Sequence, residues 1–558
     1  AGNWQDTVLD AHGAVVLQVV LSSSTLETWE QSDFGLSSRD LAMNVALPEL
    51  DGKVLSRAIS FKSAAEYDEF VEAPIVRHSP LADRVDFVAD LAAGWVRLRR
   101  KAANDRNVAI VLANYPNRDG RIANGVGLDT PAGTIEVLQA MAGAGYAVGE
   151  IPADGDALVR ALQAGVTNAA DAGREVRATL SLNDYKRLFE ALPKVIQDQV
   201  TARWGAPEAD PFWRGDAQAF ALPLMRLGKV MVGIQPARGY NIDPKQSYHS
   251  PDLVPPHGYF AFYFFLRETF GADAMIHMGK HGNMEWLPGK SLGLSAECYP
   301  EAVFGPMPHL YPFIVNDPGE GTQAKRRASA VILDHLTPPL TRAESHGVLK
   351  DLEALVDEYY QAQGADPRRV KLLAPRILDL VRDSGLDQDA GIGKGDDESR
   401  SLEKLDAYLC DLKEMQIRDG LHVFGKAPEG RLLTDLTVAL ARLPRRDGLG
   451  GNASLTRAIA GDGFGFGKES LRRGTPTPNP SLQGGGESSA PFDPLDCAMA
   501  EPWAGPKPEI LHSLSTDPWR TNGDTVERIE LLAAKFVGRE VTCPDGWHAT
   551  RTVLDEIE

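Results

Sequence analysis

Two histidines and a glutamate lie close together in the stretch Met275–Lys290. His277, His281 and Glu285 follow one another at intervals of four residues, with glycines between them. Neutral imidazole nitrogens and carboxylate oxygens bind divalent metal ions, and both groups also accept protons. The sequence therefore predicts a site that is catalytic, metal-binding or both, with His277, His281 and Glu285 as its candidate residues.

An interval of four residues is typical of one face of a helix, but the local sequence favours a loop. Gly279 and Gly282 interrupt the cluster, and glycine is unfavourable inside a helix. The apolar run Ala274–Met278 before them predicts a short strand. Because ligand sites of α/β proteins lie beyond the carboxyl ends of strands, we place the cluster in a loop at such an end. Either histidine alone could be a structural imidazole, whereas the group as a whole favours a function. The peptidase pattern HExxH is absent.

A second group of polar side chains comes before the cluster. It follows the predicted strand 229–235 and consists of Arg238, Tyr240, His249, Asp252 and His257. Polar groups on loops between strands commonly face a pocket, although the nearby prolines and glycines would also explain an irregular surface loop. We predict that this group binds substrate together with four residues nearer the cluster: Lys280, Trp286, Lys290 and Arg326. For Arg326, which lies in a basic run, a solvated helix face is the alternative.

Two segments come close to a nucleotide-binding P-loop. Gly289-Lys-Ser291 has the right ending, but Met284 stands where glycine is required. Gly467-Lys-Glu469 has Asp462 at the glycine position and a glutamate where a hydroxyl should bind magnesium. Neither segment is a P-loop, so any ATP hydrolysis must come from a partner.

The composition excludes several classes of protein. Lys and Arg number 58 against 77 Asp and Glu, a formal charge of −19, and an acidic surface repels nucleic acid and anionic membranes. The longest dense apolar run, Gly258–Leu266, is about half of what a membrane span needs. The four cysteines include no CxxC pair, which is typical of a protein in a reducing compartment. We therefore expect a cytoplasmic protein that binds neither nucleic acid nor membrane.

A chain of 558 residues is too long for one core, and its pattern changes near residue 316. Short buried-strand runs alternate with helices before that point, and apolar spacing predicts mostly helices after it. The predicted fold class is multidomain α/β, with parallel-sheet, Rossmann-like units, followed by a mainly α-helical region. The predicted divisions are an α/β region at 1–105, an α/β region with the cluster at 106–315, a mainly helical region at 316–470, a disordered Pro/Gly/Ser-rich linker or insertion at 471–495 and a helical tail at 496–558.

Local signals predict individual elements. A helix should begin at Asp129 or Thr130, after a glycine-rich loop that lacks the full dinucleotide fingerprint, so a plain connection is favoured over an anion site. The aromatic segment 259–265 is apolar on all sides, which favours a buried helix over a surface that stacks on a flat ligand. Another helix should run from a capping-box-like start at Asp317 to about His335. Strands are expected at 15–21, 108–113, 229–235 and 274–278, and further helices at 343–363, 367–384, 399–419, 431–443 and 524–537.

Several long motifs occur in the order found in one protein family. They are Gln235–Tyr240, Tyr248–Asp252, His257–Tyr259, His277–Lys290, Pro312–Arg327 and Asp334–Pro339. Together they resemble the family of large chelatase subunits, which includes CobN of aerobic cobaltochelatase and the porphyrin-binding subunit of magnesium chelatase. The likeness extends more loosely from Asn117 to Arg528. Members of the family are longer, and the chain is similar to their middle.

The resemblance implies an activity and its components. Asn316–Gly321 and Lys280–Asn283 are similar to the cobalt branch, which implies ATP-driven insertion of Co²⁺ into hydrogenobyrinic acid a,c-diamide in cobalamin synthesis. ATP and Mg²⁺ would be used by AAA+ partner subunits, CobS and CobT. On this view the three cluster residues deliver Co²⁺ or accept protons, while Arg238, Lys280 and Lys290 meet the carboxylates of the corrinoid rim. The alternatives are a magnesium chelatase H-type subunit acting on protoporphyrin IX, a non-catalytic tetrapyrrole or metal carrier, and, less favoured, a metal-dependent hydrolase.

Overall fold

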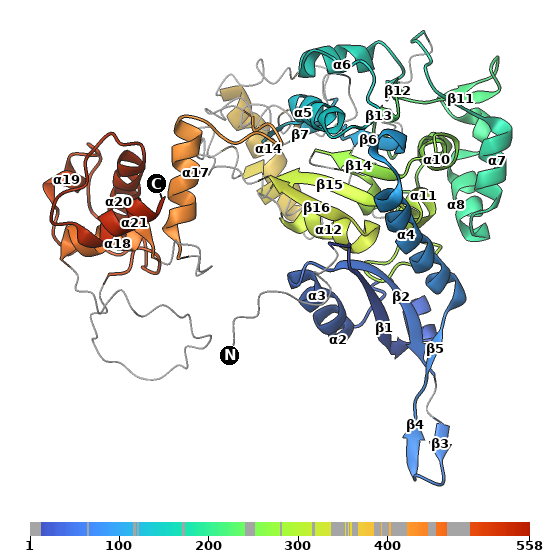
Figure 1. The fold of residues 1–558 in the computed structure, drawn as a ribbon, viewed down its shortest axis with the longest axis horizontal. Helices are drawn as coiled ribbons and strands as arrows, with labels where there is room; N and C mark the ends of the chain where they lie inside the picture. The colour runs from blue at the N-terminus through green and yellow to red at the C-terminus, as the bar shows by residue number, and fades with distance from the viewer. Residues whose placement is uncertain are drawn as a thin grey trace. The chain divides into compact units, whose positions relative to one another are not determined.

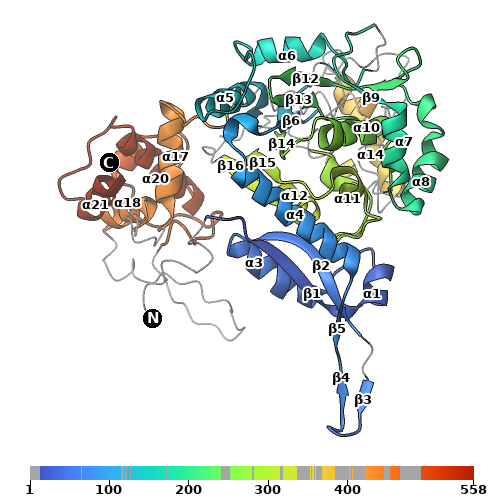
Figure 2. The same cartoon turned by 45° about the vertical axis from the view of Figure 1, so that its right-hand side comes forward.

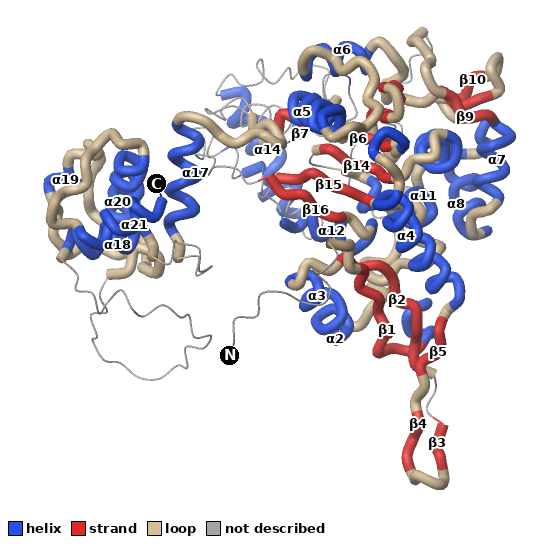
Figure 3. The backbone as a smooth tube through the Cα atoms, in the orientation of Figure 1, coloured by secondary structure: helices blue, strands red, loops and turns tan. Residues whose placement is uncertain are grey.

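The chain is represented by a computed structural model, drawn from two directions in Figures 1 and 2 and by secondary structure in Figure 3. It divides into two compact units, residues 1–336 with 420–426 and residues 337–419 with 427–558. The structure describes residues 13–63, 66–114, 119, 122–125, 127–169, 173–239, 252–279, 282–314, 318–335, 352, 355–356, 358–359, 367–383, 392, 401–402, 405, 421–444, 453–465 and 492–557.

A six-stranded sheet forms the centre of the first unit (Figure 1). Its strand order is β12-β13-β6-β14-β15-β16, and every neighbouring pair is parallel except β12 with β13. The carboxyl ends of the parallel strands lie at one edge, so the loops that leave them converge there. The strands are β6 (Val108–Leu112), β12 (Leu224–Leu227), β13 (Val230–Ile234), β14 (Ala274–Met278), β15 (His309–Ile314) and β16 (Val331–His335).

Helices cover both faces of this sheet, which explains why its central strands are apolar on both sides. Along β6, Ile110 lies in one core with α5 and α6, and Val111 beside it lies in the other core with α10 and α11. Asp129 begins α5 by accepting a hydrogen bond from the amide of Ala132. The helices are α5 (Thr130–Gly143), α6 (Gly155–Gln163), α7 (Leu182–Glu190), α8 (Lys194–Trp204), α10 (His257–Phe264), α11 (Tyr299–Phe304) and α12 (Pro318–Ala328).

The amino-terminal part of the first unit is a smaller α/β layer with the strand order β1-β2-β5. Buried Glu301 of α11 forms ion pairs of 2.7 Å with Arg57 of β2 and with Arg84 of α4, so these pairs fasten the layer to the larger sheet. A hairpin of β3 and β4 extends away from the layer in both views (Figures 1 and 2). The elements are β1 (Leu17–Thr25), α1 (Leu26–Gln31), α2 (Ser38–Asp40), α3 (Leu47–Leu50), β2 (Val54–Lys62), β3 (Glu66–Asp68), β4 (Ala73–Ile75), β5 (His78–Pro80) and α4 (Ala82–Arg100).

Short strands complete the first unit, and helices make up the second in its described residues. The short strands are β7 (Asn124–Gly125), β8 (Leu128–Asp129), β9 (Thr179–Ser181), β10 (Trp213–Arg214) and β11 (Ala219–Ala221). No helix in the described ranges has both the length and the apolar character to cross a membrane. The helices of the second unit are α14 (Pro367–Asp383), α17 (Arg431–Arg442), α18 (Leu455–Phe464), α19 (Glu509–His512), α20 (Asn522–Val537) and α21 (His548–Ile557).

The α/β character with parallel strands agrees with the sequence prediction, and α14, α17 and α20 fall at the helices predicted at 367–384, 431–443 and 524–537. The helices predicted at 343–363 and 399–419 lie mostly outside the described residues. One predicted helix differs from the structure. The helix predicted from Asp317 to about His335 is wrong beyond Ala328, because Val331–His335 forms the edge strand β16 beside β15. Its run of Val, Ile and Leu favours a strand once a neighbouring strand is available. The proposed linker 471–495 lies mostly outside the described residues.

Candidate functional site

Polar side chains gather on one face of β14 and β15. His277 lies on β14, and His309 and Tyr311 lie on the adjacent strand β15. His309 and Tyr311 share a face because alternate residues of a strand point the same way. α10 packs on this face and places Tyr263 against His277. His277, His309 and Tyr263 are at most 3% exposed, so their polar atoms must satisfy one another.

The donor and the acceptor of each hydrogen bond among these residues can be assigned. Nδ1 of His309 lies 3.2 Å from the carbonyl oxygen of Ala328, which can only accept, so this nitrogen carries the proton. Nε2 of His309 then accepts from Nδ1 of His277 at 2.7 Å, and Nε2 of His277 accepts from the hydroxyl of Tyr263 at 2.9 Å. We call His309, His277 and Tyr263 the imidazole relay. Both ring nitrogens of His277 are occupied, so His277 would have to release a partner before it could bind a metal.

Side-chain amides connect the relay to the loop that carries Glu285. The hydroxyl of Tyr263 accepts from Nε2 of Gln235 at 3.1 Å, and Oε1 of Gln235 accepts from the backbone amide of Asn283 at 3.1 Å. The Asn283 side chain accepts from the hydroxyl of Tyr259 at 2.6 Å. The loops after β13 and β14 are therefore held together next to the relay, which fixes the backbone just before Glu285.

Burial keeps both histidines of the relay neutral. Desolvation lowers the pKa of His277 well below 6.5, with a further contribution from the neighbouring His309. Desolvation also lowers the pKa of His309, to about 4, against the opposing effect of its hydrogen bond to Ala328. A neutral relay is required by the hydrogen-bond directions, since a charged imidazole would leave one ring nitrogen with no acceptor.

Acidification is expected to destabilise the first unit through this relay. The unfolded chain takes up protons on these histidines near pH 6.5 and the folded chain takes up one on His309 near pH 4, so stability is lost as the pH falls between these values. For His309 the loss should reach about 3 kcal/mol. Urea unfolding at several pH values should show this slope in the wild type and a reduced slope in His309→Gln. The exposed His78→Gln variant should keep the full slope, and an unchanged slope in His309→Gln would contradict the assignment.

Glu285 lies at the carboxyl end of β14, in the turn Met284–Trp286, and is 1% exposed. Its Oε1 accepts from the hydroxyl of Tyr311 at 3.0 Å, and that hydroxyl accepts from the amide of Gly282 at 3.1 Å. A Cβ atom at Gly282 would lie 2.7 Å from Oε1 of Glu285, so this close packing requires glycine. The carboxylate is thus held by a hydroxyl group of strand β15 and shielded from water, where electrostatic interactions are stronger than in solvent.

Two buried arginines surround this turn. Burial lowers the pKa of Arg238, while Tyr259 and Glu285 act in the opposite direction, which places the guanidinium within electrostatic range of the Glu285 carboxylate. Arg327 of α12 donates to the backbone carbonyls of Glu285 and Leu287, among others in the same loop. Arg327 therefore fixes the shape of the loop, while Arg238 supplies a cation beside the carboxylate.

The structure brings together only some of the residues that the sequence singled out. Tyr240, His249, Lys280 and His281 lie outside the described residues. His257 is buried and bonds to the hydroxyl of Tyr185 and the carbonyl of Gly205, away from the relay. Asp252 and Trp286 are exposed.

Lys290 and Arg326 have intramolecular partners in the amino-terminal layer. The ammonium group of Lys290 donates to the carbonyls of Glu30 and Ser32. Arg326 binds the carboxylate of Glu49 through two hydrogen bonds of 3.0 and 2.9 Å. A role for either side chain in binding substrate carboxylates would have to compete with these contacts.

Several residues of the site were not predicted. They are the relay residues His309 and Tyr263 and four that hold the loops, Tyr311, Gln235, Asn283 and Arg327. Alternation of polar and apolar residues in His309–Phe313 was the available signal, since a histidine and a tyrosine two residues apart on a buried strand share a face. Their partners depend on how strands and helices pair in space.

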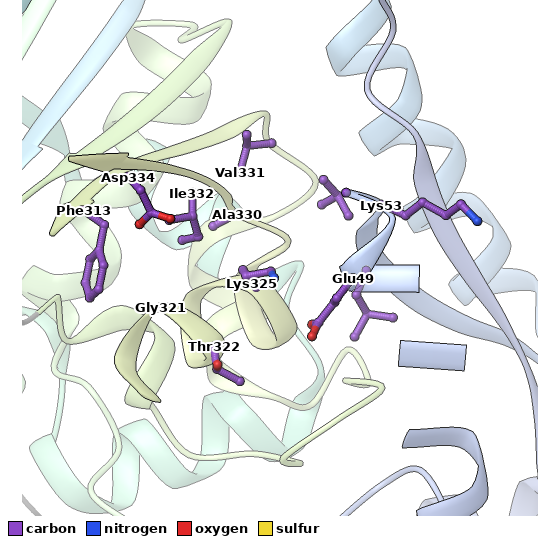
Figure 4. Close-up of a pocket in the computed structure, with 13 residues that line it drawn as sticks. Glu49, Lys53, Phe313, Gly321, Thr322, Lys325, Ala330, Val331, Ile332 and Asp334 are labelled. Carbon is purple, nitrogen blue, oxygen red and sulfur yellow. The ribbon is translucent and has the colours of Figure 1, made fainter. Parts of the chain in front are cut away.

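Among the described residues, no group of three or more His, Cys, Asp or Glu side chains could hold a metal ion. The predicted set of His277, His281 and Glu285 includes a residue outside that part, so it stays a prediction. A cavity of about 410 Å³ lies elsewhere in the first unit, between α12 and β16 on one side and α3 and β2 on the other (Figure 4). It mixes apolar side chains with Lys325 and Glu49, and Glu49 already binds Arg326. This cavity is separate from Glu285 and the relay.

Comparison with known proteins gives one consistent family. The chain is 68% identical to the aerobic cobaltochelatase subunit CobN of Sinorhizobium sp. over 99% of its own length and 43% of the relative's. It is 51% identical to CobN of Pseudomonas aeruginosa, covering 97% of this chain and 41% of the relative. The H-type magnesium-chelatase protein of Chlorobaculum parvum is 31% identical, covering 72% of this chain and 30% of the relative. The chain thus spans less than half the length of these relatives.

A solved structure has a similar fold. The catalytic subunit of cobaltochelatase from Mycobacterium tuberculosis matches with a TM-score of 0.58 and 39% identity, covering 81% of this chain and 38% of that one. A family model described as CobN/Magnesium Chelatase matches residues 2–554. Because that match extends over nearly the whole chain, the protein belongs to the CobN/magnesium chelatase family.

Proposed function

We propose that this chain is the part of a tetrapyrrole-binding chelatase subunit that inserts Co²⁺ into hydrogenobyrinic acid a,c-diamide in aerobic cobalamin biosynthesis. The observation that carries the proposal is the buried Glu285 carboxylate, which accepts a hydrogen bond from Tyr311 and lies within electrostatic range of Arg238, beyond the carboxyl end of β14. Ligands of α/β proteins bind at this edge. The family membership supplies the class of reaction.

Metal insertion makes two demands that this site can meet. The incoming ion must lose water, and the ring nitrogens of the macrocycle must lose protons. A desolvated carboxylate can act as a transient ligand and as a general base, so we assign both tasks to Glu285, with His281 as the second ligand. His277 acts through the relay, where it holds Tyr263 and thereby the loop before Glu285. His277 is then a positioning residue in the resting site.

The substrate's carboxylates require cations near the site although the protein is acidic overall. Arg238 is 5% exposed and close to Glu285, which suits a charge-assisted bond to the corrinoid rim. We assign rim binding to Arg238 and Lys280, with Tyr240, His249 and Asp252 from the same substrate-binding prediction around the macrocycle. His257 would join them only after leaving Tyr185 and Gly205, which bind both of its ring nitrogens. Lys290 and Arg326 would join them only after leaving their partners in the amino-terminal layer.

ATP hydrolysis is assigned to separate AAA+ subunits, CobS and CobT, which would use Mg²⁺ with the nucleotide. The two segments nearest to a P-loop lack the required glycine, so the chain itself offers no phosphate cradle of that kind. A magnesium chelatase acting on protoporphyrin IX is the second candidate. The cobalt branch is favoured because identity to the two CobN relatives is 68% and 51%, against 31% for the H-type magnesium-chelatase relative.

Reconstitution of insertion tests this function. The protein is incubated with the AAA+ subunits, ATP and either Co²⁺ with the corrinoid or Mg²⁺ with protoporphyrin IX, and the absorbance of the metallated ring is followed. We expect ATP-dependent turnover only with Co²⁺ and the corrinoid. Turnover with Mg²⁺ and protoporphyrin IX would contradict the cobalt assignment, and tight macrocycle binding without turnover would identify a carrier instead. Omission of ATP is the control.

A further inference from the structure

Two more histidines lie against each other at the same edge of the sheet. His335 is the last residue of β16, and His422 pairs with Leu128 of β8, just before α5. Their ring centroids are 5.7 Å apart, with the ring planes at 50°. Both residues belong to the first unit, and neither takes part in the imidazole relay.

The pair lies on the sheet face opposite to the relay. His335 is the register partner of Ile314, so by alternation it shares a face with Leu310, which packs against the core of α5 and α6. The relay lies on the face covered by α10 and α12. The two histidine pairs therefore flank the sheet edge from different sides.

His335 has a buried nitrogen that nothing in the described part of the chain satisfies. The residue is 9% exposed, and its Nε2 has no hydrogen-bond partner there. Burying a polar atom without a partner is unfavourable, so such an atom calls for an explanation. The surroundings include the ring of Phe424, whose centroid is 6.0 Å away and which offers no donor. An imidazole nitrogen with a free lone pair is the usual protein ligand of a transition metal ion.

The distance between the two imidazole rings is the one expected when both bind a single metal ion. An imidazole nitrogen binds such an ion at about 2.1 Å, so two rings on one tetrahedral ion hold their centroids roughly 5 to 6 Å apart. The observed centroid distance of 5.7 Å falls within this range. Neighbouring strands lie about 4.8 Å apart, and β15 separates β16 from β14, so the pair is on the order of 10 Å across the sheet from the end of β14.

We propose that His335 and His422 form a docking site for a transition metal ion, which holds the Co²⁺ substrate before it reaches Glu285. The identity of the ion as substrate rests on the proposed function, whereas the site itself rests on the two imidazoles. Two nitrogen ligands, with water completing the coordination, bind an ion weakly enough to release it. Imidazole also selects Co²⁺ over Mg²⁺, which prefers oxygen ligands.

Cobalt titration of the purified protein, without ATP, macrocycle or partners, tests the site. The visible absorbance of bound Co²⁺ should saturate at a site that excess Mg²⁺ does not displace and Zn²⁺ does. His335→Gln and His422→Gln should each weaken this binding at least about tenfold, since even indirect partners of a metal contribute that much. The exposed His78→Gln is the matched control and should bind as the wild type does.

Three results would overturn the proposal: no saturable cobalt site in the wild type, equal affinity in the His335 and His422 variants, or loss of the same site in Glu285→Gln. X-ray absorption of cobalt bound to the wild type needs no variant and should report two imidazole ligands, whereas a shell of oxygens alone would contradict it. The titration measures cobalt binding to the protein and does not require insertion into a macrocycle. A negative titration would therefore contradict the metal site, whereas a negative insertion assay would contradict the proposed function.

Discussion

Replacement of Glu285 by glutamine is expected to lower the rate of cobalt insertion by about 10²- to 10⁴-fold, the usual contribution of a general base. Glutamine keeps the shape of the side chain and can still accept from Tyr311, which lies 3.0 Å from Oε1. It cannot take a proton from the macrocycle, and it is a poorer metal ligand than a carboxylate. Loss of this charge leaves the buried Arg238 without its neighbouring carboxylate, so the variant is expected to be less stable, and urea unfolding must show that it is folded under the assay conditions.

The controls separate chemistry from binding. Glu285→Gln should bind the corrinoid with unchanged affinity in an absorbance titration, whereas Arg238→Ala should bind it about tenfold or more weakly, as loss of a charge-assisted bond predicts. Glu297→Gln, an exposed position before α11, should insert cobalt at the wild-type rate. Full activity in Glu285→Gln would remove this residue from the mechanism.

The sequence predicted the strands β6, β13 and β14 because their signal is local, whereas β15 was not predicted. Ala274–Met278 and the runs near β6 and β13 are short, apolar and bounded by polar residues, as buried parallel strands require. The edge strand β16 was missed because Val331–His335 follows a helix directly and its strand character depends on β15 beside it. Propensity alone does not report a neighbour that is distant along the chain.

The candidate site was predicted only where its residues lie close together in sequence. Glu285 stood out through its spacing from His277 and His281. His309 could not be paired with His277 without the alignment of β14 with β15, and Tyr263 was read as part of a uniformly apolar helix. That helix is indeed buried on all sides, yet one hydroxyl on it orients His277. A compositional pattern does not distinguish a packing tyrosine from a hydrogen-bonding one.

No sequence pattern indicated that Glu301 organises the first unit, although it binds two buried arginines. Its carboxylate accepts from Arg57 at 2.7 Å and from Arg84 at 2.7 and 2.8 Å, and all three side chains are at most 7% exposed. The three residues come from α11, β2 and α4. Their ion pairs therefore join the amino-terminal layer to the sheet that carries Glu285.

Glu301→Gln is expected to destabilise the first unit by about 3 to 5 kcal/mol, because removal of one partner leaves two buried guanidinium groups uncompensated. The matched control is Asp83→Asn, which removes the charge of a second carboxylate that pairs with Arg84 at 3.0 Å, on a side chain that is 54% exposed. Solvent screens that pair, so its loss should cost less than about 1 kcal/mol. Hydrogen exchange of peptides from β2, α4 and α11 in urea measures both effects locally, and equal losses in the two variants would show that burial of Glu301 is not what stabilises the layer.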